Sequence, residues 1–134
     1  MPAQLIHMQP DEGPAFSAVG DVYRILATGD QTGGAYALCE ARVLPGGGPP
    51  PHIHHREDES FFVLEGEITF QLAGKKVVAK AGSFIQGPRG IPHAFKNEST
   101  VPARMLILCR RQASRSSSPS SPRRCRPSIR RPRR

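Results

Sequence analysis

The sequence predicts an all-β protein, either a sandwich or a small barrel, and three observations support this. Between residues 20 and 108, short segments rich in β-branched, aromatic and other apolar residues recur at roughly 8–12-residue spacing. Turn residues, mostly glycine, separate these segments. No stretch before residue 109 has convincing helical periodicity.

The expected strands follow one another closely along the chain. "DVYRILATG" and "AYALCEARVL" are the first two, split by "GDQTGG", and the loop "PGGGPPP" follows them. The segment "SFFVLEGEITFQLAGKKVVAKAGSFIQGP" is interpreted as four strands with turns at Gly66, Gly74 and Gly82, and "HAFKN" and "ARMLILC" supply two more. The side chains expected mostly in the core are Phe61, Phe70, Phe84, Phe95, Tyr36, Leu38 and Met105.

The chain is expected to hold one domain, an all-β barrel over residues 20–109, between an N-terminal extension (1–19) and a disordered tail (110–134). Arg, Ser and Pro make up 21 of the 25 tail residues, and such a composition buries too little apolar surface to fold. The tail is interpreted either as an arginine-rich arm that binds nucleic acid or lipid headgroups, or as a GC-rich gene read in a shifted frame, which is favoured.

The net charge of +8 comes from this tail, which carries ten arginines and no acids, so residues 1–109 have a net charge of −2. No nucleic acid is therefore expected to bind the barrel. The three cysteines, Cys39, Cys109 and Cys125, lack C-x-x-C spacing and are expected to be free thiols. No signal peptide is evident and the run "MLILC" is too short to span a bilayer, so we expect a cytoplasmic protein with no membrane association.

Three of the five histidines are concentrated in the stretch "GGGPPPHIHHREDES". In an extended strand His52 and His54 share a face, and two imidazoles on one face can bind one metal ion, whereas His55 points the other way. A further ligand is expected from a distant strand, and His93 begins "HAFKN" after the turn residues "GPRGIP". His7 is expected to be incidental.

Three acids follow these histidines, and strand alternation alone does not choose among them because the turn "HRED" interrupts it. Glu59 would continue an inward apolar row with Phe61 and Val63. Glu57 falls in the turn and Asp58 is out of phase, so both are expected in a solvated turn. The alternative for the whole cluster is a polar barrel mouth without metal.

Two segments of the chain carry spaced motifs of glycine, histidine, proline and acidic or amide residues. The first motif, G-x5-H-x-H-x4-E-x6-G, is matched by Gly46, His52, His54, Glu59 and Gly66. The second, G-x5-P-x-G-x2-H-x3-N, is matched by Gly82, Pro88, Gly90, His93 and Asn97. The chain therefore resembles a compact single-domain cupin over about residues 20–108, and it departs from that pattern in the tail.

The resemblance implies a small β-barrel of the jelly-roll type with one divalent transition metal ion inside it, held by His52, His54, Glu59 and His93. Three imidazoles and one carboxylate leave two octahedral positions for water, oxygen or a chelating substrate. A structural zinc site would instead be closed, usually by thiolates. Mn, Fe, Co, Ni, Cu and Zn are all compatible with this donor set.

Three functions are compatible with such a site. The segment from Gly33 to Phe70 resembles small monocupins described as flavonol (quercetin) dioxygenase-like, which implies a metal-dependent dioxygenase for a small aromatic or chelating substrate, with Glu59 as ligand and catalytic base. The alternatives are a metal-dependent isomerase, epimerase or decarboxylase, and a small-ligand binder without catalysis. Cupins commonly pair through sheet faces or edges, so a homodimer is expected.

Overall fold

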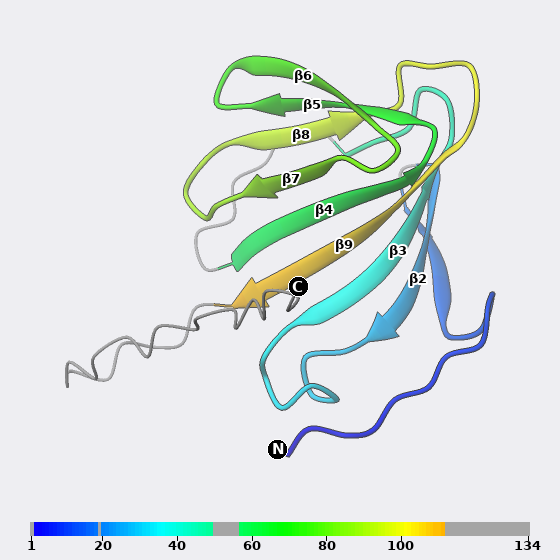
Figure 1. Cartoon of the computed structure of the whole chain (residues 1–134), viewed down its shortest axis with the longest axis vertical. Helices are drawn as coiled ribbons and strands as arrows, with labels where there is room; N and C mark the ends of the chain where they lie inside the picture. The colour runs from blue at the N-terminus through cyan, green and yellow to red at the C-terminus, as the bar shows by residue number, and fades with distance from the viewer. Residues whose placement is uncertain (1, 19, 50–56, 112–134) are drawn as a thin grey trace, which may run out of the picture.

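A computed structural model describes residues 2–18, 20–49 and 57–111 of the chain. These residues form nine strands and no helix, arranged in two antiparallel sheets (Figure 1), which confirms the all-β expectation. The strands are β1 (Ala15–Ala18), β2 (Asp21–Ala27), β3 (Ala37–Val43), β4 (Glu57–Glu65), β5 (Glu67–Leu72), β6 (Lys75–Lys80), β7 (Phe84–Gly87), β8 (His93–Lys96) and β9 (Ala103–Arg111). A search of this part of the chain for a helix able to cross a membrane finds none.

Strands β2 to β9 correspond to the eight segments expected from the sequence. Strand β1 was not expected, because its sequence "AFSA" is short and mostly exposed and shows no apolar alternation. It pairs with β2, so the sheet begins inside the segment regarded as an N-terminal extension. Strand β9 continues through Arg111, two residues past the expected end of the barrel domain.

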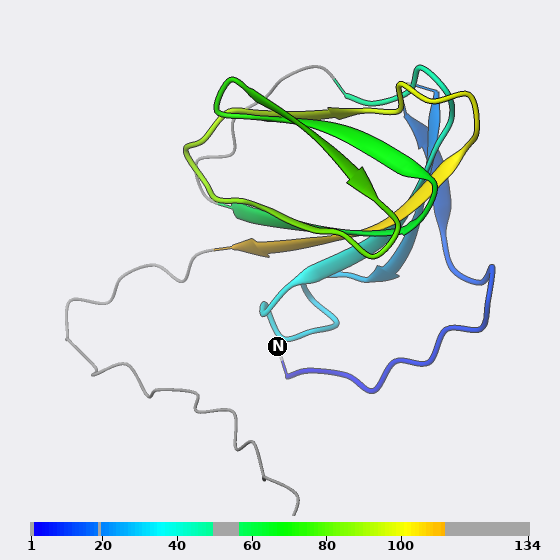
Figure 2. The same cartoon turned by 45° about the horizontal axis from the view of Figure 1, so that its top comes forward.

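The large sheet has the order β1-β2-β3-β9-β4-β7 and the small sheet the order β6-β5-β8. The two sheets lie face to face with the core between them (Figure 2), as in a jelly-roll barrel. Strand β4 shows why this arrangement follows from the sequence, since Glu59, Phe61 and Val63 are buried and Phe62 between them is exposed. The rings of Phe61, Phe70 and Phe95 contact one another with centroids 5.1 to 6.0 Å apart and form the centre of the core.

Two residues expected in the core are exposed. Phe84 is 61% exposed because it pairs with Phe62 on the outer face of the large sheet, which leaves the neighbouring Ile85 to pack against the core. Tyr36 precedes β3 and is 40% exposed. The expectation was wrong at these positions because residue type alone does not give the facing of a short edge strand or of a loop.

Candidate metal centre

Glu59 and His93 meet inside the barrel although they come from different sheets. Glu59 lies on β4 of the large sheet and His93 is the first residue of β8 in the small sheet. Both are buried, with exposed fractions of 8% and 2%, and the His93 Nε2 atom is 3.4 Å from Glu59 Oε2. Residues 34 positions apart in sequence are thus adjacent in space, as the paired motifs imply.

The orientation of the His93 ring suits a metal ligand. Its Nδ1 atom is 3.1 Å from the carbonyl oxygen of Ile91, so an Nδ1–H tautomer donates a hydrogen bond there and leaves the Nε2 lone pair toward Glu59. A carboxylate oxygen and a neutral imidazole nitrogen are both electron-pair donors, and a cation placed near both is attracted by each. The donor chemistry of Glu59 and His93 therefore fits a divalent transition metal.

Apolar and small residues surround the two side chains. The ring of Phe61 contacts the His93 ring edge-on, with centroids 6.1 Å apart. Gly87 on β7 pairs with Glu59, and a Cβ atom there would lie 3.2 Å from His93 Nδ1, so a glycine makes room for the imidazole. These neighbours limit the access of water to the pair, which strengthens electrostatic interactions at this site.

The thiols and the phenol on the inner wall are neutral near pH 7. Burial, followed by the charge of Glu59, raises the pKa of Cys39 to about 11 and that of Cys109 to about 12. Burial, followed by the charge of Asp21, raises the pKa of Tyr23 to about 12. Cys39 and Cys109, the cysteines of the described part of the chain, are free, as the sequence predicts, and neither is a ready thiolate ligand.

The other two acids of the motif region lie in strand β4 rather than in a turn, which corrects the sequence interpretation. Asp58 accepts a hydrogen bond of 2.9 Å from the backbone N–H of Arg89, and its second oxygen is 3.7 Å from the Arg89 guanidinium. A Glu57 oxygen lies 3.8 Å from the Nε atom of Arg111. Glu59, in contrast, lies beside His93.

His52 and His54 lie outside the described residues, as does His55. Within residues 2–18, 20–49 and 57–111, no group of three or more His, Cys, Asp or Glu side chains is arranged to hold a metal ion. The structure thus brings together two of the four expected ligands, and the complete set of four stays a prediction from the sequence.

The loop that leads into the first motif is held on one side by Asn97. The Gly46 N–H donates to the Asn97 carbonyl (2.7 Å), and the Asn97 N–H donates to the Gly47 carbonyl (2.9 Å). The buried Asn97 side chain donates to the carbonyl oxygens of Val43 (2.9 Å) and Val101 (2.8 Å). This last residue of the second motif therefore fixes the loop that precedes His52.

On its other side the same loop covers Asp21, a residue that the sequence analysis missed. Asp21 is fully buried, close to the backbone N–H groups of Leu44 and Gly48 and to the hydroxyl of Tyr23. Neither carboxyl oxygen has a donor in good hydrogen-bond geometry, and burial raises its pKa despite these neighbours. An aspartate that begins a strand usually lies at the surface, so the sequence offers no signal for this role.

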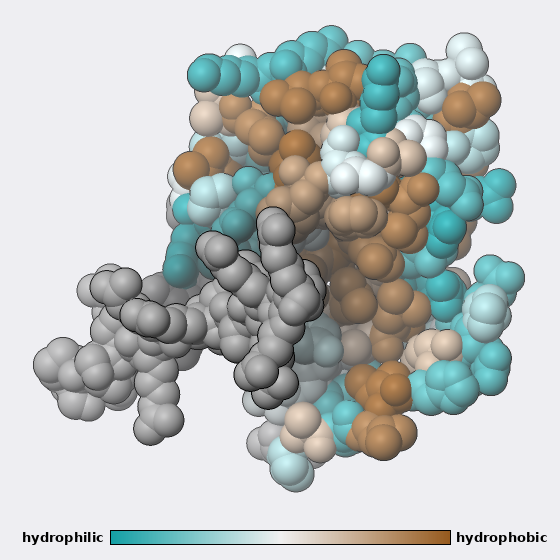
Figure 3. Space-filling model, viewed as in Figure 1, coloured by the Kyte–Doolittle hydropathy of each residue, from teal (hydrophilic) through white to brown (hydrophobic). Residues whose placement is uncertain are grey.

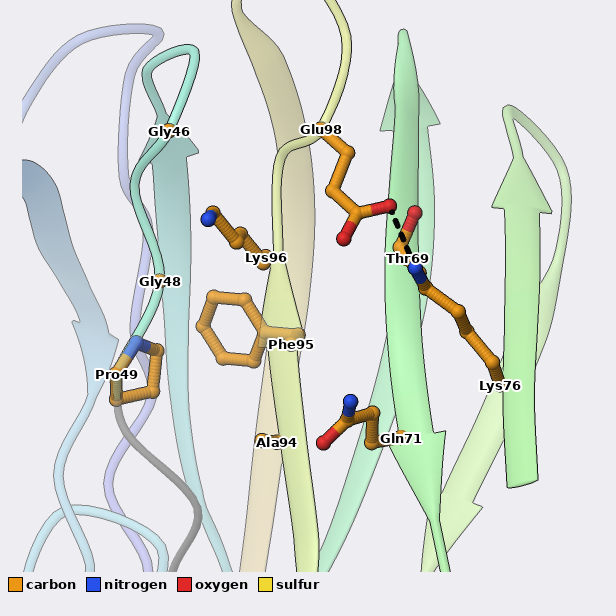
Figure 4. Close-up of a pocket in the computed structure, with 10 residues that line it drawn as sticks. All are labelled: Gly46, Gly48, Pro49, Thr69, Gln71, Lys76, Ala94, Phe95, Lys96 and Glu98. Atoms are coloured by element: carbon orange, nitrogen blue, oxygen red, sulfur yellow. Dashed lines mark ion pairs between the residues drawn. The ribbon is translucent and has the colours of Figure 1, made fainter. Parts of the chain in front are cut away.

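Two cavities lie near these elements. One, of about 250 Å³, is lined in part by Tyr36, Glu57, Cys109 and Arg111, and it adjoins the site because Cys109 pairs with Glu59. The other, of about 430 Å³, lies between the loop residues Gly46, Gly48 and Pro49 and the small sheet, and the Lys76–Glu98 ion pair of 3.1 Å borders it (Figure 4). Neither lining includes Glu59 or His93, whereas a third cavity, of about 60 Å³, is lined by His93 together with Gln71, Gly74, Pro92 and Ala94.

Several known proteins are similar to this chain. Nectarin-1 from Nicotiana langsdorffii x Nicotiana sanderae is 39% identical over 77 residues, which cover 52% of this chain and 33% of nectarin-1. Quercetin 2,3-dioxygenase from Bacillus subtilis is 25% identical over 92 residues, which cover 69% of this chain and 27% of that enzyme. The chain thus spans about a third of the length of these curated relatives.

Solved structures share the fold. A predicted oxalate decarboxylase from Thermotoga maritima superimposes with a TM-score of 0.72 and 19% identity, over 81% of this chain and 100% of the other. The profile of the Cupin_2 family, described as "Cupin domain", matches residues 39–109, which is more than half of the chain and includes Glu59 and His93. On the fold, the paired motifs and this match, the chain belongs to the cupin family.

Proposed function

We propose that this cupin is a metal-dependent dioxygenase that acts on a small aromatic or chelating substrate. The observation that carries the proposal is the contact of 3.4 Å between His93 Nε2 and Glu59 Oε2, made in an apolar barrel beside a cavity of about 250 Å³. The similarity to quercetin 2,3-dioxygenase supports the choice of reaction. The proposed ligands are His52, His54, Glu59 and His93.

The chain's own residues have distinct parts in this proposal. The bound ion would supply Lewis acidity and a site for oxygen and substrate. Glu59 accepts the proton of a substrate hydroxyl at a carboxylate oxygen and retains it within the barrel. The Ile91 carbonyl fixes the His93 tautomer, and Phe61 restricts water around the pair.

The test is a screen of metals against substrates. Purified protein loaded with Mn, Fe, Co, Ni, Cu or Zn is incubated with flavonols in air, and the loss of substrate absorbance is followed. Oxygen-dependent turnover with at least one metal is expected, and no turnover with any metal refutes the dioxygenase. Turnover of sugars or small carboxylic acids without oxygen would support the isomerase or decarboxylase instead.

Two variants test whether Glu59 is the catalytic base. Glu59→Gln keeps the size of the side chain but removes its basicity, so turnover should fall by about 100-fold or more. Glu65→Gln, which changes an exposed acid at the other end of the same strand, should retain activity. Equal losses in both variants would contradict the assignment of the base to Glu59.

A further inference from the structure

The outer face of the small sheet bears a polar cavity whose lining does not include Glu59 or His93. Its volume is about 430 Å³, and sites for small molecules usually enclose about 300–1,000 Å³. Outward-facing residues of β5 and β8 form its floor, and the loop of residues 44–49, which is hydrogen-bonded beside β8, forms one wall. Figure 3 shows hydrophilic surface at the top of the view, where β6 lies in Figure 1, and apolar surface over the middle of the large sheet. This side of the barrel therefore suits a polar ligand.

The strand register brings the polar groups of the cavity floor together. Thr69 on β5 lies directly opposite Lys96 on β8, and Gln71 lies opposite Ala94. Directly opposed side chains have Cβ atoms about 4.5–5.5 Å apart, so the Thr69 hydroxyl and the stem of Lys96 are neighbours. Ala94 is small, which leaves the floor hollow beside Gln71. A ligand on this floor would meet a hydroxyl, an amide and an ammonium group together.

Thr69 and Lys96 both have polar groups to offer such a ligand. Thr69 is only 6% exposed, and within the described residues its hydroxyl makes no hydrogen bond. Lys96 makes no ion pair with any residue of the same part of the chain. A largely buried hydroxyl is costly unless water or a ligand bonds to it. These two groups are thus available, side by side, to bind an oxygen-rich anion.

The charges of the lining favour a ligand with a single negative charge. Figure 4 shows Lys96 on the loop side of the cavity and the Lys76–Glu98 ion pair of 3.1 Å on the other side, with Gln71 between them. Because Glu98 balances Lys76, Lys96 supplies the uncompensated positive charge among the described lining residues. A carboxylate matches this charge, whereas a doubly charged phosphate would be repelled by Glu98. The Glu98 oxygens can also accept hydrogen bonds from ligand hydroxyl groups.

We propose that this cavity is a binding site for a small hydroxylated carboxylate, with the size and chemistry of a sugar acid. The Lys96 ammonium pairs with the carboxylate, and the Thr69 hydroxyl and the Gln71 amide donate hydrogen bonds to ligand oxygens. Glu98 accepts a hydrogen bond from a hydroxyl group farther along the ligand. The site lies on the side of the small sheet that faces away from the core, so it does not depend on the metal or on the proposed dioxygenase.

Titration of the isotope-labelled full-length protein with gluconate, followed by nuclear magnetic resonance, tests this proposal. Gluconate should shift the amide resonances around Thr69 and Lys96 and leave that of Glu59 unchanged. Sorbitol has the hydroxyl groups without the charge, and inorganic phosphate has the charge without the carbon chain. Each of these two probes should therefore bind about 10-fold more weakly than gluconate, or weaker still.

Variants locate the binding. Lys96→Gln removes the charge from an exposed side chain and should weaken gluconate binding by about 10-fold or more. Thr69→Val keeps the shape of the side chain but removes the hydroxyl, and should weaken binding by about threefold or more. The matched control is Lys80→Gln, which changes an exposed lysine of β6 outside the cavity lining and should leave binding unchanged.

Several results would overturn the proposal. They are no binding of gluconate, resonance shifts centred on Glu59, binding of sorbitol or phosphate as tight as that of gluconate, an unchanged affinity in Lys96→Gln or Thr69→Val, and an equal loss in Lys80→Gln. Circular dichroism of each variant should match the wild type, so that a loss of binding reports on the cavity rather than on the fold.

Discussion

Asp21 starts β2 as a fully buried carboxyl group beneath the loop of residues 44–49. Its pKa is raised by burial, so the folded protein holds this proton more firmly than the unfolded chain does. The contribution of Asp21 to stability is therefore present at low pH and is lost as the pH rises through its raised folded-state pKa.

Asp21→Asn should remove this pH dependence because an amide does not titrate. We expect the melting temperature of the variant, relative to wild type, to increase between pH 4 and pH 8. Differential scanning fluorimetry across this range measures it, and Asp58→Asn is the control, since Asp58 is hydrogen-bonded to Arg89 rather than enclosed by a loop. A constant difference between wild type and Asp21→Asn would contradict the prediction.

The Asn97 side chain satisfies the backbone carbonyl of Val43, just before the loop of residues 44–49, and that of Val101, in the connection between β8 and β9. Asn97→Ala leaves the carbonyl oxygens of Val43 and Val101 without these donors, and such losses cost about 1–3 kcal/mol each. We expect the free energy of unfolding in urea to fall by about 2–4 kcal/mol. Ser99→Ala, which removes the hydroxyl that donates to the Asn97 side-chain oxygen, should lower the free energy of unfolding by less.

The sequence predicted which way some of these side chains face, and it gave no indication for others. The i, i+2 alternation placed Glu59 on the inner face with Phe61, and the second motif supplied His93, because both follow from strand geometry and spacing. Asp21 was missed because its burial depends on a loop more than twenty residues later in the chain. Such a contact is tertiary and leaves no local pattern.

At the scale of the elements, the close approach of the loop of residues 44–49 to β8 places the strictest limit on residue type. Gly48 has φ of +134°, and a Cβ atom there would lie 2.1 Å from the carbonyl oxygen of Phe95. Gly48→Ala should therefore force the loop away from β8 and lower the free energy of unfolding by more than about 2 kcal/mol. Metal binding should weaken with it, because the loop leads directly into His52.

Gly74 provides the matched comparison. It has φ of +81° in the turn between β5 and β6, and no atom lies within 4 Å of a Cβ built there. Gly74→Ala should therefore cost only the backbone strain of about 1–2 kcal/mol. Equal losses for both variants in urea denaturation would show that the contact with Phe95 is not what requires glycine at position 48.

The strands were predictable where apolar residues alternate and glycines mark the turns, as in β4 and β5. Which side of β7 is buried was not predictable, because Phe84 and Ile85 are both apolar. Only the pairing with β4 decides which of the two side chains is buried. The start of β4 at Glu57 was also missed, since charged residues rarely indicate a strand.

For the molecule as a whole, the barrel is expected to fold without the tail. Within the described residues, strand β9 runs to Arg111, which pairs with Glu57 at the start of β4, and it pairs with β3 along the whole of that strand. A chain that stops after Arg111 should keep its far-ultraviolet circular dichroism and melt within a few degrees of the full-length protein. A large drop in melting temperature would show that residues 112–134 contribute to the fold, and sequencing the gene tests the shifted frame directly.

The two-sheet architecture was predictable only through the paired motifs, because spacing alone allowed a sandwich or a barrel. The cavities and the apolar outer face were not predictable. They depend on which side chains of different strands become neighbours, and that register is fixed by the assembled sheets rather than by any one segment.

The contact between Glu59 and His93 also has a mechanical consequence. The described strands form two separate hydrogen-bonded sheets, and the Glu59–His93 contact joins one sheet to the other. A ligand that binds both side chains would link the two sheets and restrict their movement relative to each other. Removal of such a ligand should speed amide hydrogen exchange in both sheets together. Ligand binding at Glu59 and His93 and the rigidity of the barrel would then depend on each other.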